Sequence, residues 1–264
     1  MKFIFNIILL LVFLNCNSDV DLIASKDSSI SIPDDSTIAF IITNKEYLFH
    51  VATYYTSEDK LFHLSKGIFD TDVCWSKEKK YLYYTKYNKD ENKYQIWKMR
   101  FDGSEKRAIT PFSISCTSPQ ISPNGQKLSF CAEIENYNQI IITDTAGGNW
   151  YQLTSSEIIP NANKALFNLP SWVSDGQHIL TTYHHYIEEH YSHPKLAKIN
   201  IYNKNITFFN KIDSLYPHHA KWSPIYEEIL FVGKALPGDQ IYRINSDQTN
   251  LIKLTDSFIA GSPD

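Results

Sequence analysis

The sequence predicts an all-β fold made of small antiparallel sheets that follow one another along the chain. Short segments rich in β-branched and aromatic residues alternate with polar neighbours and are separated by turn residues, as half-buried strands are. No long segment has the 3.6-residue period of an amphipathic helix. The third observation is a repeat: Trp75, Ile121, Trp172 and Trp222 occupy the same position in four similar units, roughly 45 to 50 residues apart. This is the period of four-stranded propeller blades, so we expect a β-propeller.

The unit over residues 117–154 shows the four strands most clearly. Residues 122–125, Ser-Pro-Asn-Gly, place Pro at the first corner of a turn and Gly where φ is positive, so the chain reverses there. Residues 128–130 then alternate apolar and polar side chains, as the second strand should. Residues 140–143 form a β-branched third strand, and residues 150–153 supply the fourth.

Three other stretches, residues 73–110, 169–209 and 220–255, can be laid over this unit and give the same order of strands. Two of them depart from the Pro-Asp/Asn-Gly turn. Residues 77–80 read Lys-Glu-Lys-Lys, and residues 225–227 read Ile-Tyr-Glu. The stretch that ends near residue 209 also lacks the closing Leu-Thr of the other units.

The shared pattern is aromatic-Ser-Pro-Asp/Asn-Gly, an Ile/Leu-x-Phe strand, an Ile-Tyr/Trp-x-Met/Ile strand, Asp-Gly and Leu-Thr. It resembles the PD40 (WD40-like) repeats of TolB-type β-propellers, from about residue 36 to the C-terminus. The resemblance implies the fold and leaves the function open, because related blades occur in TolB, in peptidase propellers and in oligogalacturonate lyases. We expect no specific TolB role, since the domain that precedes the TolB propeller has no counterpart here. No Gly-x-Ser-x-Gly sequence is present to indicate a peptidase.

The two ends of the repeat region look complementary. Residues 38–43, 47–54 and 60–64 form three predicted strands that correspond to the second, third and fourth strands of a blade. Residues 256–264 match the approach to a first strand and then stop. We expect this C-terminal strand to join the N-terminal blade and close a ring of about five blades, which would remove exposed sheet edges. An incomplete ring is the alternative.

Residues 1–15 are predicted to be a signal peptide, because Lys2 precedes an apolar stretch that is too short to span a bilayer. Cys16 follows Phe-Leu-Asn, which resembles a bacterial lipobox although Phe13 and Asn15 depart from the usual pattern. We expect Cys16 to be lipidated, with ordinary signal cleavage nearby as the alternative. Residues 16–36 would then be the lipidated Cys and a polar, flexible tether, and residues 37–264 the propeller domain.

These features predict a membrane-anchored lipoprotein of the bacterial cell envelope that faces the periplasm or the cell surface. The formal net charge is −4 at pH 7 and no basic stripe is present, so nucleic acid is not an expected partner. We expect a monomer that meets the membrane through its lipid anchor.

Cys116 and Cys131 flank the first hairpin of the unit described above. Pairing Ile121 with Leu128 would place Cys116 opposite Glu133, so the two thiols would be diagonal to each other. A disulfide is geometrically allowed at that spacing. Buried free thiols are the expectation.

Histidine is the strongest chemical signal. Residues 183–193 contain four His and two Glu between two predicted strands, and a further His pair precedes the first strand of the next unit. Imidazole and carboxylate ligate zinc or manganese, but the spacing matches no established motif, so we expect a polar surface loop and no cofactor. The lyase resemblance implies an alternative, a Mn- or Zn-dependent carbohydrate-active enzyme. Its candidate ligands are His184, His185, His218 and His219.

The function that we expect is a non-catalytic scaffold that binds an envelope protein or peptide, with no catalytic residues. Aromatic side chains often anchor protein interfaces. The candidate partner-binding residues are Tyr183, Tyr186, Tyr191 and Tyr216.

Overall fold

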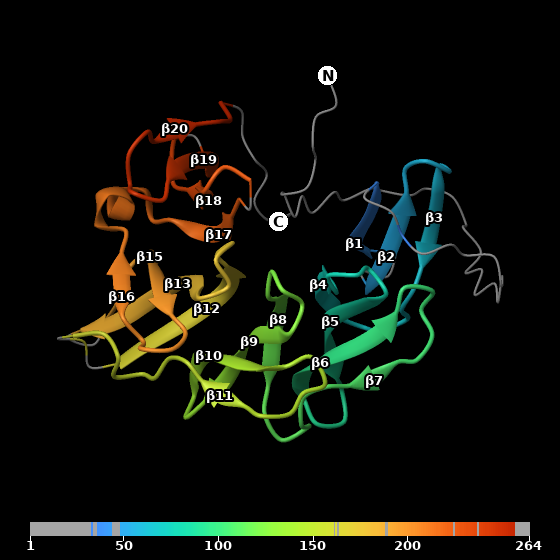
Figure 1. Ribbon diagram of the computed structural model, residues 1–264. Coiled ribbons are helices and arrows are strands. Elements are labelled where there is room, and N and C mark those ends of the chain that lie inside the picture. The colour runs from blue at the N-terminus through green and yellow to red at the C-terminus, as the bar shows by residue number, and fades with distance from the viewer. Residues whose placement is uncertain are drawn as a thin grey trace. The chain divides into compact units, whose positions relative to one another are not determined.

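The computed structural model describes residues 33, 36–43, 48–160, 162, 164–187, 190–223, 225–236 and 238–256. The described residues form five antiparallel sheets, which are the blades of a β-propeller, so the predicted all-β class is confirmed (Figure 1). The predicted signal peptide, the predicted lipidation site at Cys16 and the C-terminal segment 257–264 lie outside the described residues. No helix in the described part of the chain is long and apolar enough to cross a membrane.

The chain divides into two compact units. The first contains the described residues up to Ala132 together with Thr143–Asn149, and the second contains Glu133–Ile142 and the described residues from Trp150 onward.

The first two sheets belong to the first unit and follow the predicted order. In the first sheet the order is β1-β2-β3, and these three strands correspond to the second, third and fourth strands of a blade. The first-strand partner that we predicted for β1 lies outside the described residues. The strands of the two sheets are β1 (Thr37–Thr43), β2 (Phe49–Tyr55), β3 (Lys60–His63), β4 (Asp70–Trp75), β5 (Tyr81–Asn88), β6 (Lys93–Arg100) and β7 (Arg107–Ala108).

The third sheet has the order β11-β10-β9-β8. Its strands are β8 (Cys116–Ile121), β9 (Lys127–Ile134), β10 (Tyr137–Asp144) and β11 (Tyr151–Gln152).

The last two sheets belong to the second unit. The fourth has the order β12-β13-β15-β16, with β14 paired to β13, and the fifth has the order β17-β18-β19-β20. A 3-10 helix, η1 (Asn210–Leu215), connects them and was not predicted. The strands are β12 (Lys164–Trp172), β13 (His178–Ile187), β14 (His190–Tyr191), β15 (Lys195–Asn200), β16 (Ile206–Phe208), β17 (His218–Trp222), β18 (Glu228–Gly233), β19 (Gln240–Asn245) and β20 (Ile252–Lys253).

The first strand of every four-stranded unit carries a β-bulge at the same place. In β17, for example, His218 pairs with Val232 and Lys221 pairs with Leu230, so two residues oppose Phe231 alone. The first residue of each bulge has positive φ and lies three residues before the repeated Trp or Ile position. These residues are Asp72 (φ 52°), Ser118 (φ 58°), Leu169 (φ 54°) and His219 (φ 51°).

The bulge corrects one predicted pairing. Ile121 pairs with Leu128 as expected, but the extra residue places Cys116 opposite Ala132 and not opposite Glu133. Cys116 and Cys131 are both buried and are not joined by a disulfide, which agrees with the expectation for this pair.

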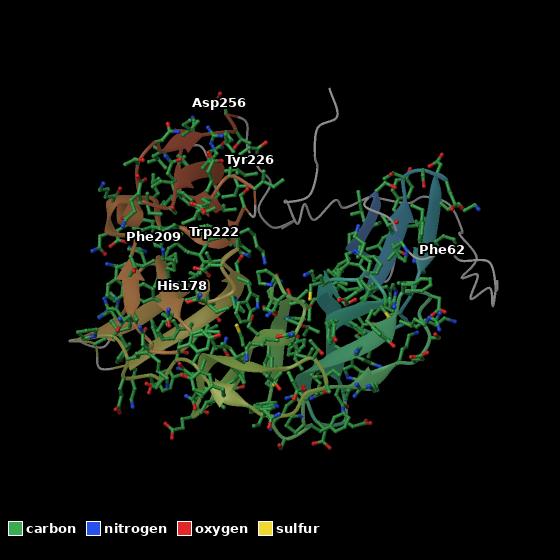
Figure 2. All side chains as sticks on the ribbon, in the orientation of Figure 1. Phe62, His178, Phe209, Trp222, Tyr226 and Asp256 are labelled. Atoms are coloured by element: carbon green, nitrogen blue, oxygen red, sulfur yellow. The ribbon has the colours of Figure 1, made fainter. Side chains whose placement is uncertain are left out.

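Apolar side chains pack between neighbouring sheets within each unit. In the first unit Ile41 and Val51 pack against Leu82 and Met99 of the second sheet. In the second unit Phe209 and Trp222 belong to one cluster that joins the fourth and fifth sheets (Figure 2). Burial of each such side chain contributes about 1.5–3 kcal/mol, so these layers hold the loops at the sheet ends in place.

Candidate functional site

The predicted His-rich loop is largely strand. β12 pairs with β13 as far as Lys164 and Tyr186, and β14 pairs with the end of β13 through Tyr186–Tyr191. The prediction of a surface loop is therefore wrong for most of this stretch, because long strands on both sides satisfy its backbone groups. Glu188 and Glu189 lie outside the described residues.

Tyr183 is part of the sheet and not of its surface. Its ring is buried, with centroids 5.9 Å from Phe167 and 5.7 Å from Phe208. Burial raises the pKa of the Tyr183 hydroxyl. Tyr183 is therefore not exposed for contact with a partner, whereas the rings of Tyr186 and Tyr191 lie 5.1 Å apart with an angle of 58° between their planes.

The two candidate ligands on β13, His184 and His185, have different surroundings. Nδ1 of His184 donates a hydrogen bond of 3.0 Å to the Ser192 carbonyl. Nδ1 of His185 is buried and has no hydrogen-bond partner in the described part of the chain. Burial lowers the pKa of His185, and the nearby Lys195 lowers it further.

Tyr216 brings the two sheets of the second unit together. It ends η1 in the left-handed conformation, with φ 48°, and its ring stacks on that of His193 with centroids 3.8 Å apart. Nζ of Lys234 lies 5.2 Å from the centre of the Tyr216 ring. The backbone N–H of Lys234 donates a hydrogen bond of 2.6 Å to the Leu215 carbonyl, which fixes the loop beside Tyr216.

His218 connects Tyr216 to a carboxylate. Its Nδ1 donates a hydrogen bond of 3.0 Å to the Tyr216 carbonyl, and its Nε2 lies 3.7 Å from Oδ2 of Asp239. The ring of His219 lies 5.1 Å from that of His218. We refer to His193, Tyr216, His218, Lys234 and Asp239 as the Tyr216 patch. Sequence reasoning included His193 only as a member of the His-rich stretch. It missed Lys234 and Asp239, because they come from a segment with no repeated spacing.

The candidate metal ligands form two neighbouring pairs, His184–His185 on β13 and His218–His219 on β17. Among the residues that the structure describes, no group of three or more His, Cys, Asp or Glu side chains is arranged to hold a metal ion. The metal site that the lyase resemblance implies stays a prediction, which metal analysis tests.

The second unit also contains a polar hollow of about 310 Å³. Its wall is held by Gln139, which accepts a hydrogen bond from Thr154 and donates one to the Ala165 carbonyl. It could not be predicted from the sequence, because its wall combines the β9–β10 hairpin with β11 and the segment that follows β11. It is lined by Ile134, Glu135, Gln139, Gln152, Ser155, Ser156 and Glu157.

No family model and no curated protein matches the sequence. Solved structures with a similar fold include TolB from Acinetobacter baumannii, with a TM-score of 0.67 and 13% identity over 87% of this chain and 55% of that chain. A protein assigned as TolB from Agrobacterium tumefaciens has a TM-score of 0.60 and 18% identity, over 75% of this chain and 66% of that one. An oligogalacturonate lyase in complex with manganese has a TM-score of 0.58 and 13% identity, over 83% and 62%.

These likenesses concern the fold. The chain spans between about half and two thirds of the length of the TolB structures that it matches. It has a TolB-like β-propeller fold, which confirms the expectation from the repeats.

Proposed function

We propose that the protein is a cell-envelope scaffold that binds a protein or peptide at the Tyr216 patch without catalysing a reaction. The observation that carries the proposal is the stacked pair of Tyr216 and His193, which holds an aromatic side chain in a defined orientation between two loops. Tyr, Trp and Arg dominate the binding energy of many interfaces.

Preorganisation favours this position over the other candidate tyrosines. The ring of Tyr216 contacts His193 and Lys234, and its backbone is fixed by η1. Binding would therefore restrict few additional rotatable bonds of this side chain and cost little conformational entropy. Tyr183 is buried and cannot reach a partner.

The surroundings have the character of an interface rim. Lys234 and the His218–Asp239 pair supply charge beside the aromatic ring. Leu236, two residues after Lys234, is 95% exposed, and Tyr191 is 52% exposed. Apolar groups of this size, next to a polar rim, fit a peptide or protein surface.

The envelope location rests on the predicted signal peptide and on Cys16, and the TolB-like fold agrees with it. A lipid anchor would keep the patch within reach of membrane-associated partners.

The test is co-purification from solubilised envelopes with the full-length chain, compared with Tyr216→Ala and Tyr202→Ala. Tyr202 is 68% exposed in the β15–β16 turn and serves as the matched control. We expect one partner to be recovered with the wild type and with Tyr202→Ala, and to fall about tenfold or more with Tyr216→Ala. Equal recovery with both variants would contradict the proposal.

Metal analysis of the same preparations, with and without a chelator, distinguishes the scaffold from the alternative, a metal-dependent enzyme. Stoichiometric manganese or zinc that the chelator removes would favour the lyase-like function over the scaffold.

A further inference from the structure

Four aromatic rings form a continuous row at one end of the first two sheets, within the first unit. Their centroids are 5.5 Å apart for Phe49–Phe69, 6.1 Å for Phe69–Tyr87 and 5.2 Å for Tyr87–Tyr94. Phe49 begins β2, Phe69 precedes β4, and Tyr87 and Tyr94 lie on either side of the β5–β6 hairpin turn (Figure 1). The four residues therefore meet at a single edge of the two sheets.

Backbone hydrogen bonds fix this row. The N–H of Phe49 donates to the Ile68 carbonyl at 3.1 Å, and the N–H of Tyr87 donates to the Phe69 carbonyl at 3.1 Å. Phe49 and Phe69 also form a parallel bridge between the two sheets. The rings are thus held by β-type pairing on both sides and do not depend on a free loop.

The row continues into exposed apolar side chains. Ile68 and Phe69 are each 39% exposed, and Phe112 is 45% exposed. The loop that carries Phe112 is tied to the start of β6, because Nζ of Lys93 donates to the Ser113 carbonyl and the N–H of Tyr94 donates to Ser115 Oγ at 3.3 Å. Exposed apolar side chains on neighbouring segments of this kind mark a contact site for a protein or a membrane.

The charged residues around the row favour a membrane over a protein as its partner. The loops that carry it hold four lysines and two exposed carboxylates, whereas the chain as a whole has a formal net charge of −4. The remaining carboxylate, Asp70, is buried. Lys66 and Lys89 are exposed, whereas Nζ of Lys86 lies 4.2 Å from the centre of the Trp97 ring. Exposed Phe and Ile side chains with lysines on the same segments suit the boundary between headgroups and acyl chains of an anionic bilayer. The charged residues are Lys66, Lys86, Lys89, Lys93, Asp90 and Glu91.

We propose that this aromatic row, with Ile68 and Phe112, is a membrane-contacting surface that rests on an anionic lipid bilayer. The chain between Cys16 and β1 supports this occupant. Residues 17–36 can extend to about 70 Å at 3.3–3.6 Å per residue, so an anchored protein could lay this edge on its own membrane. Tethering also raises the effective concentration of the lipid surface, which allows a small apolar contact to be occupied. The surface shares no residue with the Tyr216 patch, which belongs to the second unit.

The experiment is hydrogen exchange read by mass spectrometry on the full-length protein in detergent, in phosphatidylcholine vesicles, and in vesicles with about 30 mol% phosphatidylglycerol. We expect amides in residues 66–69, 87–94 and 111–115 to exchange about tenfold more slowly on the anionic vesicles than in detergent. Residues 77–80, in the β4–β5 turn at the opposite end of β4 and β5 from the row, should exchange equally in all three conditions.

A double variant, Phe69→Ser with Phe112→Ser, should lose the protection on vesicles while it keeps wild-type exchange in detergent. Leu236→Ser, which alters an exposed apolar residue of the second unit, should keep the protection. Equal exchange in detergent and on vesicles would overturn the proposal, and so would protection that also covers residues 77–80. Protection that arises only when envelope proteins are added would also overturn it and assign the surface to a protein partner.

Discussion

The rings of Tyr216 and His193 lie nearly parallel, with centroids 3.8 Å apart and an angle of 27° between their planes. One residue follows η1 and the other precedes β15, so the contact joins two sheets at the end of each. This stack therefore has a structural effect that can be measured separately from any partner.

Replacement of His193 by Ala should lower the free energy of unfolding by about 0.5–1.5 kcal/mol, the usual value of an aromatic pair. Urea unfolding measures the change. Tyr202→Ala is the control, because its exposed ring should change the free energy by less than about 0.5 kcal/mol. Equal effects for the two variants would show that the stack contributes nothing.

Asp70 should make stability depend on pH. Burial raises the pKa of Asp70 above 3.8, although the Gly67 N–H bonds its Oδ2 at 3.0 Å. The carboxyl of Asp70 therefore binds its proton more tightly in the folded protein than in the unfolded chain. This stabilises the fold fully at pH values below the pKa that Asp70 has in the unfolded chain, and the contribution is lost as pH rises through the pKa that it has in the folded protein. The difference in unfolding free energy, Asp70→Asn minus wild type, should therefore increase as pH rises from 3.8. Urea titrations at a series of pH values would measure it, and a constant difference would refute the assignment.

Two glycines with positive φ should differ in their tolerance of a methyl group. A Cβ on Gly147 would lie 2.3 Å from the Ile109 carbonyl oxygen, whereas a Cβ on Gly176 would meet nothing within 4 Å. Gly176→Ala should cost only about 1–2 kcal/mol of left-handed backbone strain. Gly147→Ala should cost about 3 kcal/mol or more, since the backbone must also move. Thermal unfolding of the two variants provides the comparison, and similar melting temperatures would contradict it.

Thr154 should be one of the most sensitive polar residues. Its buried hydroxyl accepts the Ile140 N–H at 2.9 Å and donates to Gln139 Oε1 at 2.7 Å. Thr154→Val leaves both groups unpaired and should cost about 2–4 kcal/mol, since each orphaned group costs about 1–3 kcal/mol. The same substitution at the exposed Thr207 of β16 should stay within about 0.5 kcal/mol. Denaturant unfolding of both variants measures this, and comparable losses would mean that the buried hydroxyl is not required.

The thiols should react with iodoacetamide in order of burial. Burial raises the pKa of Cys116 to about 12, so at pH 8 only about one molecule in ten thousand carries the thiolate. Cys74 is only partly buried and should be alkylated first in the folded protein. Peptide mass spectrometry after timed labelling gives the order, with a guanidinium-unfolded sample as control. Alkylation of Cys116 as fast as Cys74 would show that its burial is not maintained.

The order of strands could be predicted because turn chemistry is local. Gly125 and Gly176 lie in the turns where the sequence required positive φ, and they have φ of 77° and 64°. Contacts between sheets could not be predicted in this way. Tyr183 and Tyr186 look equivalent in sequence, yet of the two only Tyr183 is buried.

Three other features could not be predicted from the sequence for similar reasons. The aromatic row combines residues from separate segments, and Phe69 lies outside any strand. The bulges have no common residue type, since Asp, Ser, Leu and His occupy the same position. The stack of Tyr216 on His193 required the unpredicted 3-10 helix.

The repeated bulge also protects the alignment of each first strand against sliding. A slip by one residue would move the left-handed conformation onto Val73, Pro119 or Pro170 in three of the four strands. Proline cannot adopt positive φ, and a β-branched residue does so only at considerable cost. Misaligned hairpins of these strands are therefore disfavoured before their side chains ever pack, which lets neighbouring copies of a similar sequence fold without exchanging partners.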